Sequence, residues 1–303
     1  MDLPLAQRTL RGSDDRITTI ASHPFLPLLA IGSATGRIFV WDTESGLLIH
    51  ALAGHTSTAS SLAFDSSGRR LASGSLDFTV RVWDLESGAC LHTLAGHTSG
   101  VYAVTWNATS ELVASGSSDE TVRLWNANSG ALRHILEGHT NWVRVVASHP
   151  TDDLLASGSN DKTMRVWRWS TGAHVHTLAG HTNIVTALTA SADWLVSGSV
   201  DKSVRVWSWA SEECARVLHD VEPRHYVTLL GWRDLTLVML VLSDRGVVHV
   251  WDTTAADPNE WLQSNVEVPY SGLSRGVSVL ANGHLACGAP MESATVVVWS
   301  LRA

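Results

Sequence analysis

The chain has 303 residues, of which 45% are hydrophobic and 17% are charged, and its formal net charge is −8. This apolar content excludes an intrinsically disordered chain and predicts a globular protein with a large core. The acidic balance disfavours a nucleic-acid-binding protein, which normally carries a basic surface. We therefore expect no nucleic acid among its partners.

The three cysteines, Cys90, Cys214 and Cys287, are scattered along the chain. Their number and spacing suit neither a disulfide framework nor a metal site, and indicate free thiols in a reducing compartment. Residues 1–12 lack the apolar core of a secretion signal, and the most apolar run, 235–242, is too short to cross a membrane as a helix. We read that run as a buried strand. We expect a protein of the cytoplasm or nucleus that is neither secreted nor membrane-bound.

Two short motifs recur along the chain at a nearly fixed interval. Gly-His pairs begin at Gly54, Gly96, Gly138 and Gly180, each 42 residues after the one before. A second motif ends in a tryptophan, and its copies are Trp41, Trp83, Trp125, Trp167, Trp207, Trp251 and Trp299. The intervals between these tryptophans are 42, 42, 42, 40, 44 and 48 residues. A period of this length indicates an array of supersecondary units.

Each regular unit contains four strand-like segments separated by turn residues. In residues 58–96 the breaks are Asp-Ser-Ser-Gly, Leu-Asp-Phe and Leu-Glu-Ser-Gly, and no helical period appears. Asp, Ser and Gly favour turns because of local hydrogen bonds and positive φ angles. The pattern predicts four short antiparallel strands per unit, which is the content of one propeller blade.

In chain order, the predicted array begins with a strand at about residues 5–11 and continues with seven units. The units are residues 13–53, 55–95, 97–137, 139–179, 181–219, 223–267 and 273–303. The last unit lacks a fourth strand, and residues 4–12, of which 7–12 align with 91–96, are expected to complete it and close the ring. The sequence thus predicts one all-β domain over residues 1–303, a seven-bladed propeller with four antiparallel strands per blade.

The order Gly-His, Ser-Gly-Ser, turn Asp and Trp-Asp resembles the WD40-repeat family over nearly the whole chain. The resemblance implies that each regular unit holds a hydrogen-bonded set of His, Ser, Asp and Trp, in which a buried carboxylate is paired. The choice of serine in each set rests on the resemblance alone. The four sets are His55, Ser73, Asp77 and Trp83; His97, Ser115, Asp119 and Trp125; His139, Ser157, Asp161 and Trp167; and His181, Ser197, Asp201 and Trp207.

A Ser-His-Asp set can be catalytic, but four copies in step with the fold indicate a structural role. We therefore expect no enzyme and no cofactor. His174 and His176 share one face of a strand, yet no third ligand is evident, so we expect no metal site. The in-phase arginines of the tryptophan motif are expected to pack their stems between blades; they are Arg81, Arg123, Arg165 and Arg205.

Three units depart from the pattern. In the first, Ser13 stands in place of His and Thr35 in place of the turn Asp. The sixth and seventh lack the Gly-His pair and carry Arg245 and Ser293 at the Asp position. Two explanations stay open: neutral drift compensated by apolar packing, or units freed to make a specific contact.

The resemblance implies that partners dock on the face that carries the Gly-His loops and the turns with Asp. On that face Tyr102, Trp142 and Arg144 belong to the residue types that dominate binding hot spots. Trp142 is either a binding residue or a packed loop anchor. The other partner-binding candidates are Ser60 and Thr186, at positions equivalent to Tyr102 and Arg144, and Leu76 and Asn160, just before the turn Asp. Arg144, with Arg16, Arg224 and Arg275 at the rim, makes a weak case for a phosphate site.

These residues favour a non-catalytic scaffold of the WD40 type that binds a protein or peptide on its top face, around the central channel. We expect a monomeric propeller within a larger complex. The alternative is a substrate-recognition subunit of a ubiquitin ligase, although an F-box-like helical motif and a Trp-Asp-x-Arg motif are both missing. An enzymatic propeller is the least favoured, because its channel would need carboxylates or histidines and the strands expected to line it carry mostly Thr, Ser, Ala and Val.

Overall fold

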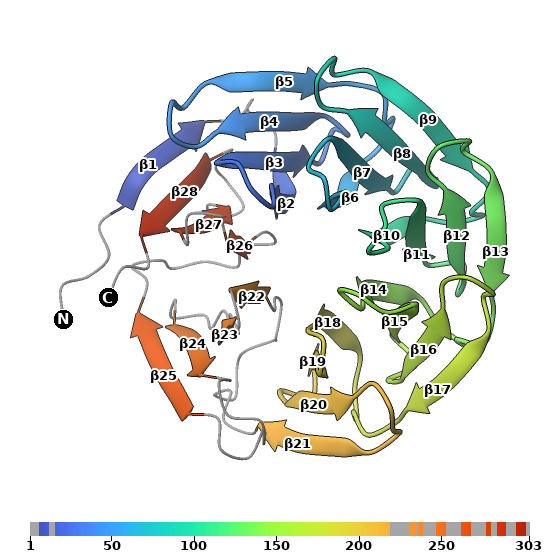
Figure 1. Cartoon of the computed structure of the whole chain (residues 1–303). Helices are drawn as coiled ribbons and strands as arrows, with labels where there is room; N and C mark the ends of the chain where they lie inside the picture. The colour runs from blue at the N-terminus through green and yellow to red at the C-terminus, as the bar shows by residue number, and fades with distance from the viewer. Residues whose placement is uncertain are drawn as a thin grey trace.

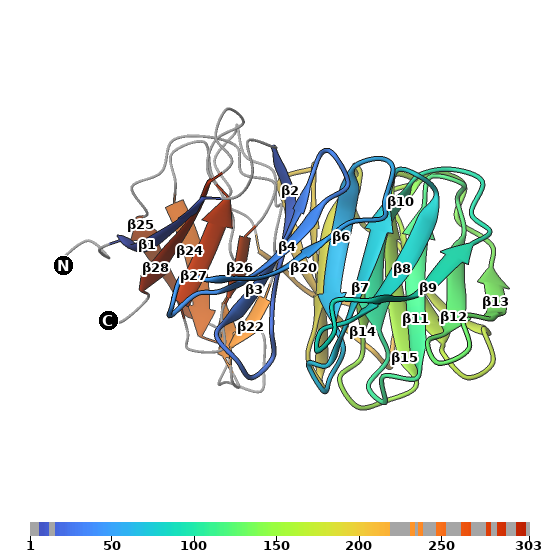
Figure 2. The ribbon, with the colours of Figure 1, turned by 90° about the horizontal axis from the view of Figure 1, so that it is seen from above.

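The structure is a computed structural model that describes residues 6–11, 16–218, 231–233, 236–238, 247–252, 262–267, 277–279, 284–288 and 295–300. Every regular element in these residues is a β-strand, as the sequence predicted. The sheets stand side by side around a central opening (Figure 1). Seen from the side, their strands run between the two faces of the ring (Figure 2).

Residues 17–218 form five consecutive antiparallel sheets of four strands each, joined in simple sequence order. The predicted four-stranded unit is confirmed for this part of the chain. The first sheet contains β2 (Ile17–Ser22), β3 (Leu28–Ser33), β4 (Ile38–Asp42) and β5 (Leu48–Leu52), and the second contains β6 (Ala59–Phe64), β7 (Arg70–Ser75), β8 (Thr79–Asp84) and β9 (Cys90–Ala95). The third sheet contains β10 (Val101–Trp106), β11 (Leu112–Ser117), β12 (Val122–Asn126) and β13 (Leu132–Leu136), and the fourth contains β14 (Val143–Ser148), β15 (Leu154–Ser159), β16 (Met164–Arg168) and β17 (His174–Leu178). The fifth sheet contains β18 (Val185–Ala190), β19 (Trp194–Ser199), β20 (Val204–Ser208) and β21 (Cys214–Leu218).

The remaining described strands come from both ends of the chain. The N-terminal strand β1 (Ala6–Arg11) pairs with β28 (Thr295–Ser300), followed by β27 (His284–Gly288) and β26 (Val277–Val279). Two further pairs are β22 (Gly231–Arg233) with β23 (Thr236–Val238), and β24 (Val247–Asp252) with β25 (Leu262–Glu267). Of the apolar run 235–242, residues 236–238 form strand β23. Five residues named in the sequence analysis lie outside the described residues: Ser13, Arg224, Arg245, Arg275 and Ser293. The side chain of Cys287 is not described either.

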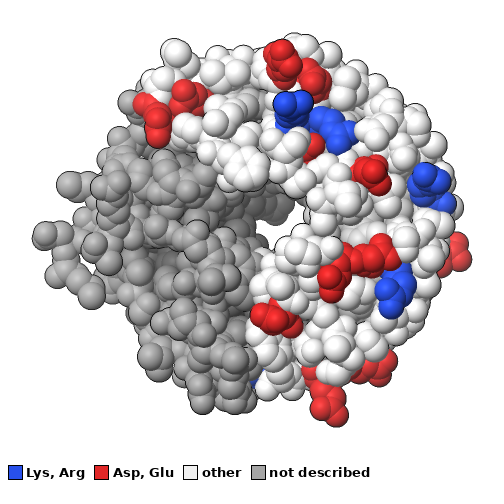
Figure 3. All heavy atoms as spheres, in the orientation of Figure 1, with Lys and Arg blue, Asp and Glu red and all other residues white. Residues whose placement is uncertain are grey.

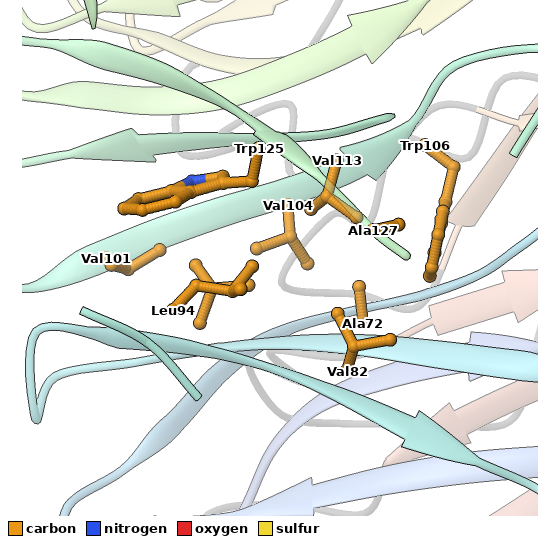
Figure 4. Close-up of a cluster of buried hydrophobic side chains, with 10 residues drawn as sticks. Ala72, Val82, Leu94, Val101, Val104, Trp106, Val113, Trp125 and Ala127 are labelled. Carbon is orange, nitrogen blue, oxygen red and sulfur yellow. The ribbon is translucent and has the colours of Figure 1, made fainter. Parts of the chain in front are cut away.

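The hydrophobic core lies between neighbouring sheets. Ala72, Val82 and Leu94 of the second sheet pack against the third sheet, as Figure 4 shows. The third sheet contributes to this cluster Val101, Val104, Trp106, Val113 and Trp125. Each sheet therefore buries its apolar side chains only against the sheet beside it, as expected for a repeat architecture.

The glycine of the Ser-Gly-Ser motif in the second, third and fourth sheets lies close to a valine of the next sheet. A Cβ atom on Gly74 would lie 2.7 Å from Cγ1 of Val101 and 3.0 Å from Cγ1 of Val104, both in the next sheet. Gly116 and Gly158 meet a valine of the following sheet in the same way. Only glycine allows this approach, which explains why the motif keeps it.

Gly74→Ala is expected to destabilise the protein by about 1–3 kcal/mol, because the added methyl group overpacks the interface between the second and third sheets. Val101→Ala should relieve part of this strain. Chemical denaturation of the two single variants and the double variant gives the test: the double variant should lose less stability than the two single losses together. Strict additivity would contradict the close approach.

Candidate functional site

In the second sheet, the four residues implied by the resemblance form one connected set. His55 Nδ1 lies 2.8 Å from Asp77 Oδ2, and His55 Nε2 lies 2.7 Å from Ser73 Oγ. The Trp83 indole N–H donates to the same Ser73 Oγ at 2.8 Å. The set ties the loop before β6 to the turn between β7 and β8 and to the tryptophan of β8.

The third, fourth and fifth sheets repeat this geometry. The His–Asp distances are 2.7 Å for His97–Asp119, 2.7 Å for His139–Asp161 and 2.9 Å for His181–Asp201. The His–Ser distances are 2.7 Å for His97–Ser115, 2.8 Å for His139–Ser157 and 2.8 Å for His181–Ser197. The indole donors are Trp125 at 2.8 Å, Trp167 at 2.9 Å and Trp207 at 2.8 Å. In each case the first serine of Ser-Gly-Ser takes part.

The electrostatics fix the direction of each hydrogen bond. Burial alone would raise the pKa of Asp77, but hydrogen bonds from Thr79, Thr56 and His55 outweigh it and lower that pKa to about 2. Burial lowers the pKa of His55, so its ring is neutral at pH 7. Nδ1–H therefore donates to the carboxylate, and Nε2 accepts from the Ser73 hydroxyl. The serine hydroxyl is fully buried, so no substrate reaches it and the set acts as a brace.

The first sheet lacks this brace, and the structure adds a reason that the sequence reasoning missed. Ile31 occupies the place of the serine, in the run Leu-Ala-Ile-Gly-Ser. The Trp41 indole nitrogen is buried and has no hydrogen-bond partner in the described part of the chain. Thr35, at the Asp position, pairs with Ser33 at 3.0 Å. Leu-Ala-Ser-Gly-Ser in the second and fourth units differs from this run at the serine, so the substitution is visible in the sequence.

The glycine of each Gly-His pair lies against the in-phase arginine of the unit that follows it. A Cβ on Gly54 would lie 2.7 Å from Nη1 of Arg81, and Gly96, Gly138 and Gly180 meet their arginines at 2.7–2.9 Å. The Arg81 guanidinium also lies 5.9 Å from the Trp83 ring. These side chains are packed into the framework and do not form a separate ligand site.

The loop before each first strand and the turn before each third strand share one face, which we call the top face. In the second to fifth sheets, the residue before the turn Asp donates its N–H to the carbonyl of the loop residue before the first strand. These pairs are Leu76–Thr58 at 3.0 Å, Ser118–Gly100 at 2.9 Å, Asn160–Trp142 at 2.9 Å and Val200–Ile184 at 2.9 Å. The brace and these bonds together hold the top face in place.

A β-bulge marks the second residue of every first strand in the five sheets. The register shifts at Thr18, Ser60, Tyr102, Arg144 and Thr186. Ser60 donates to the carbonyls of Gly74 at 3.0 Å and Val101 at 2.5 Å, so its hydroxyl joins two sheets. Tyr102 and Arg144 stand at the same position with long side chains. Bulges commonly re-aim a side chain in this way.

Tyr102, Trp142 and Arg144 contact one another, and we call them the Tyr-Trp-Arg cluster. The two rings stack at 5.6 Å between centroids with an interplanar angle of 18°. The Arg144 guanidinium carbon lies 4.8 Å from the Tyr102 ring and 4.9 Å from the Trp142 ring. The Asn160 carboxamide oxygen accepts a hydrogen bond from Arg144 Nε at 2.8 Å. Trp142 remains 40% exposed, so the cluster is ordered and accessible at once.

The other candidates on the top face have local contacts. Leu76 lies against Gly100, where a Cβ would meet its Cδ2 at 2.9 Å. Thr186 donates to the Gly198 carbonyl at 3.4 Å. Ser60 joins two sheets, as described above. Of the seven predicted residues, the structure brings four together: Tyr102, Trp142, Arg144 and Asn160.

The central cavity encloses about 640 Å³ and is lined partly by hydroxyl groups, among them Thr19, Ser61, Thr105 and Thr189. Among the described residues no group of three His, Cys, Asp or Glu side chains could hold a metal ion. His174 bonds to Thr177 and His176 faces Glu212, so the two histidines have separate partners. Cys90 and Cys214 are free thiols.

Charged side chains are scattered over the face seen in Figure 3, and its described part shows no continuous basic surface. No helix long and apolar enough to cross a membrane occurs in the described residues.

Comparison with known families gives five matches to the model described as WD domain, G-beta repeat. They cover residues 6–42, 46–84, 88–126, 130–168 and 172–208. Together these segments make up more than half of the chain. The first match includes strands β2, β3 and β4 of the sheet that lacks the His–Ser–Asp–Trp set.

Curated relatives match over short segments. The Lissencephaly-1 homolog of Monosiga brevicollis is 40% identical over 55 residues, which are 18% of this chain and 13% of that protein. The Striatin homolog of Dictyostelium discoideum is 39% identical over 57 residues, 19% of this chain and 7% of that protein. The chain thus matches only a small part of these relatives' length.

Two solved structures are similar over nearly the whole chain. The structure of U3-55K has a TM-score of 0.87 at 20% identity, covering 98% of this chain and 100% of that one. The crystal structure of the RRP9 WD40 repeats has a TM-score of 0.87 at 20% identity and covers 99% of both chains. At this identity the similarity shows the fold.

Asp119→Ala is expected to cost on the order of 2–4 kcal/mol of unfolding free energy, because it leaves His97 and the Thr98 N–H without their acceptor. Asp193→Ala, at an exposed turn, is the matched control and should change stability by less than about 0.5 kcal/mol. Equal melting temperatures for Asp119→Ala and wild type would show that the set does not brace the turn.

Stability should fall on acidification in two stages. The folded-state pKa of His55 and His181 lies below the ordinary 6.5, so below that pH the unfolded chain binds more protons and stability drops. Asp77 and Asp201 have folded-state pKa values of about 2 against an ordinary 3.8, so a second loss follows as the pH falls from the ordinary value towards 2. Melting temperatures recorded at constant ionic strength should decline through both ranges; a melting temperature that rises below pH 6.5 would contradict the neutral histidines.

Proposed function

Because the chain belongs to the WD40-repeat family, we propose that it is a non-catalytic scaffold that binds a protein or peptide on its top face around the central channel. The observation that carries the proposal is the Tyr-Trp-Arg cluster. Aromatic residues and arginine supply most of the energy at binding hot spots. Here they lie on a face that four His–Ser–Asp–Trp sets hold in place, so binding would require little ordering of the surface.

We further propose that residues 1–303 form one seven-bladed domain closed by the N-terminal strand. The pairing of β1 with β28 supports this closure. Trp251 lies in β24 and Trp299 in β28, in the strands expected to anchor the sixth and seventh blades. Closure would leave no open sheet edge for unwanted pairing.

The proposed binding surface extends at its margins to Ser60 and Thr186, which are equivalent to Tyr102 and Arg144, and to Leu76, which is equivalent to Asn160. A location in the cytoplasm or nucleus is part of this proposal and rests on the scattered cysteines, which suit a reducing compartment. The family match and the similar structures give no support to a substrate-recognition role in a ubiquitin ligase, and we do not propose it.

The test is affinity capture from the source cells, read by mass spectrometry, with wild type beside the variant Tyr102→Ala/Trp142→Ala/Arg144→Ala. We expect at least one partner to be lost by this variant. The matched control is Phe25→Ala/Leu47→Ala, which removes exposed apolar side chains from the turns between first and second strands and between third and fourth strands, at the other face. Partners kept by the cluster variant and lost by the control would move the site to that other face.

A further inference from the structure

Arg144 is a partly buried cation that the described chain leaves without a counter-ion. Its guanidinium lies against two aromatic rings, and no carboxylate comes within 4.0 Å of it in the part of the chain described here. Arg70, by comparison, pairs with Asp65 at 3.2 Å. A cation screened from water on one side gains from an anionic partner more than a fully solvated one does.

The hydrogen bonds of Arg144 leave one edge of the guanidinium available. Nε is occupied by the Asn160 oxygen at 2.8 Å. Nη1 and Nη2 make no hydrogen bond to any described residue. Two adjacent nitrogens with parallel N–H groups match the two oxygens of a planar carboxylate, which accepts from both at once.

The equivalent loop and turn positions of the two neighbouring sheets are uncharged. Gly100 and Ile184 occupy the loop positions equivalent to Trp142, and Val200 occupies the turn position equivalent to Asn160. The Trp142 ring itself is 40% exposed. At the bulge, loop and turn positions of the third to fifth sheets, Arg144 is therefore the one charged residue, and it lies beside the exposed Trp142 ring.

We propose that Arg144 binds a carboxylate of the docked peptide, with the Tyr102 and Trp142 rings contacting apolar atoms next to it. The inference rests on the proposed function and names the chemistry that the top face recognises. A carboxylate fits better than a phosphate, because a dianion calls for several cationic donors and Arg144 is the one arginine at its position among the five described sheets.

The experiment begins with selection of a random-peptide display library with free C termini on the purified full chain. Selected peptides should share an Asp or Glu, or depend on their C-terminal carboxylate. Replacing that Asp by Asn or Glu by Gln, or amidating the C terminus, distinguishes the two sources. Fluorescence anisotropy should show a loss of about ten- to a hundredfold in affinity for whichever change removes the carboxylate.

Three variants of the chain complete the test. Arg144→Gln should lower the affinity for the acidic peptide by about the same factor as removal of the carboxylate does. It should leave the affinity for the neutralised peptide unchanged, so that the two changes are not additive. Asn160→Asp supplies the missing counter-ion from within and should weaken acidic peptides while the melting temperature stays equal or rises. Arg144→Glu should select basic peptides in place of acidic ones.

Peptides that lose affinity with Trp142→Ala, yet bind equally with and without a carboxylate and to Arg144→Gln, would overturn the inference and leave the proposed function standing. Tighter binding of a peptide with phosphoserine at the acidic position would also overturn it. A selection that yields no peptide, or only peptides insensitive to Trp142→Ala and Arg144→Gln alike, would overturn both this inference and the proposed function.

Discussion

The hydrogen-bonded set of Trp, Ser, His and Asp is the interaction on which the rest of this structure depends. It joins three segments that are far apart within a unit: the loop before the first strand, the second strand, and the turn before the third. Each member satisfies a polar group that would otherwise be buried without a partner, and the carboxylate stays ionised because several donors surround it. Because the set fixes both top-face segments, the side chains that project from them keep their positions.

The first sheet shows what the set contributes. With Ile31 in place of the serine, the strands still pair in the same order, and Ile31 itself packs with Ile20 and Leu29. The sheet therefore forms from its backbone pairing and apolar packing without the set, but the Trp41 N–H is left without an acceptor in the described residues. The set is thus not needed to make a sheet of four strands. Its contribution is to hold the top-face loops.

Much of this framework could be predicted from the sequence, because its causes are local and repeat. The 42-residue step of Gly-His and Trp located the units, and the turn residues within them, such as Asp-Ser-Ser-Gly at 65–68 and Leu-Glu-Ser-Gly at 85–88, located the strands. The role of the glycines could not be predicted in the same way. Gly74 is constrained by Val101, and Gly54 by Arg81, and both contacts arise only when the chain has folded.

The candidate site was predictable in part. Tyr102, Trp142 and Arg144 stood out as unusual residues in their columns of equivalent positions, but their mutual contact joins two sheets and no periodicity reveals it. The role of Asn160 in holding the guanidinium likewise depends on side-chain geometry. Ser60 looked equivalent to Arg144, yet its short hydroxyl reaches the backbone of the next sheet instead.

The β-bulge in each first strand has a consequence for how such a protein acquires new specificities. The residue at the bulge is the point where the strand leaves its regular register, so its side chain can change in length and charge while the ladder on either side keeps its pairing. Thr18, Ser60, Tyr102, Arg144 and Thr186 already span a short hydroxyl, a phenol and a cation on one backbone. A duplicated unit therefore arrives with its scaffold complete and one position open to selection, and a ring of such units can diverge in what it binds without having to rediscover how to fold.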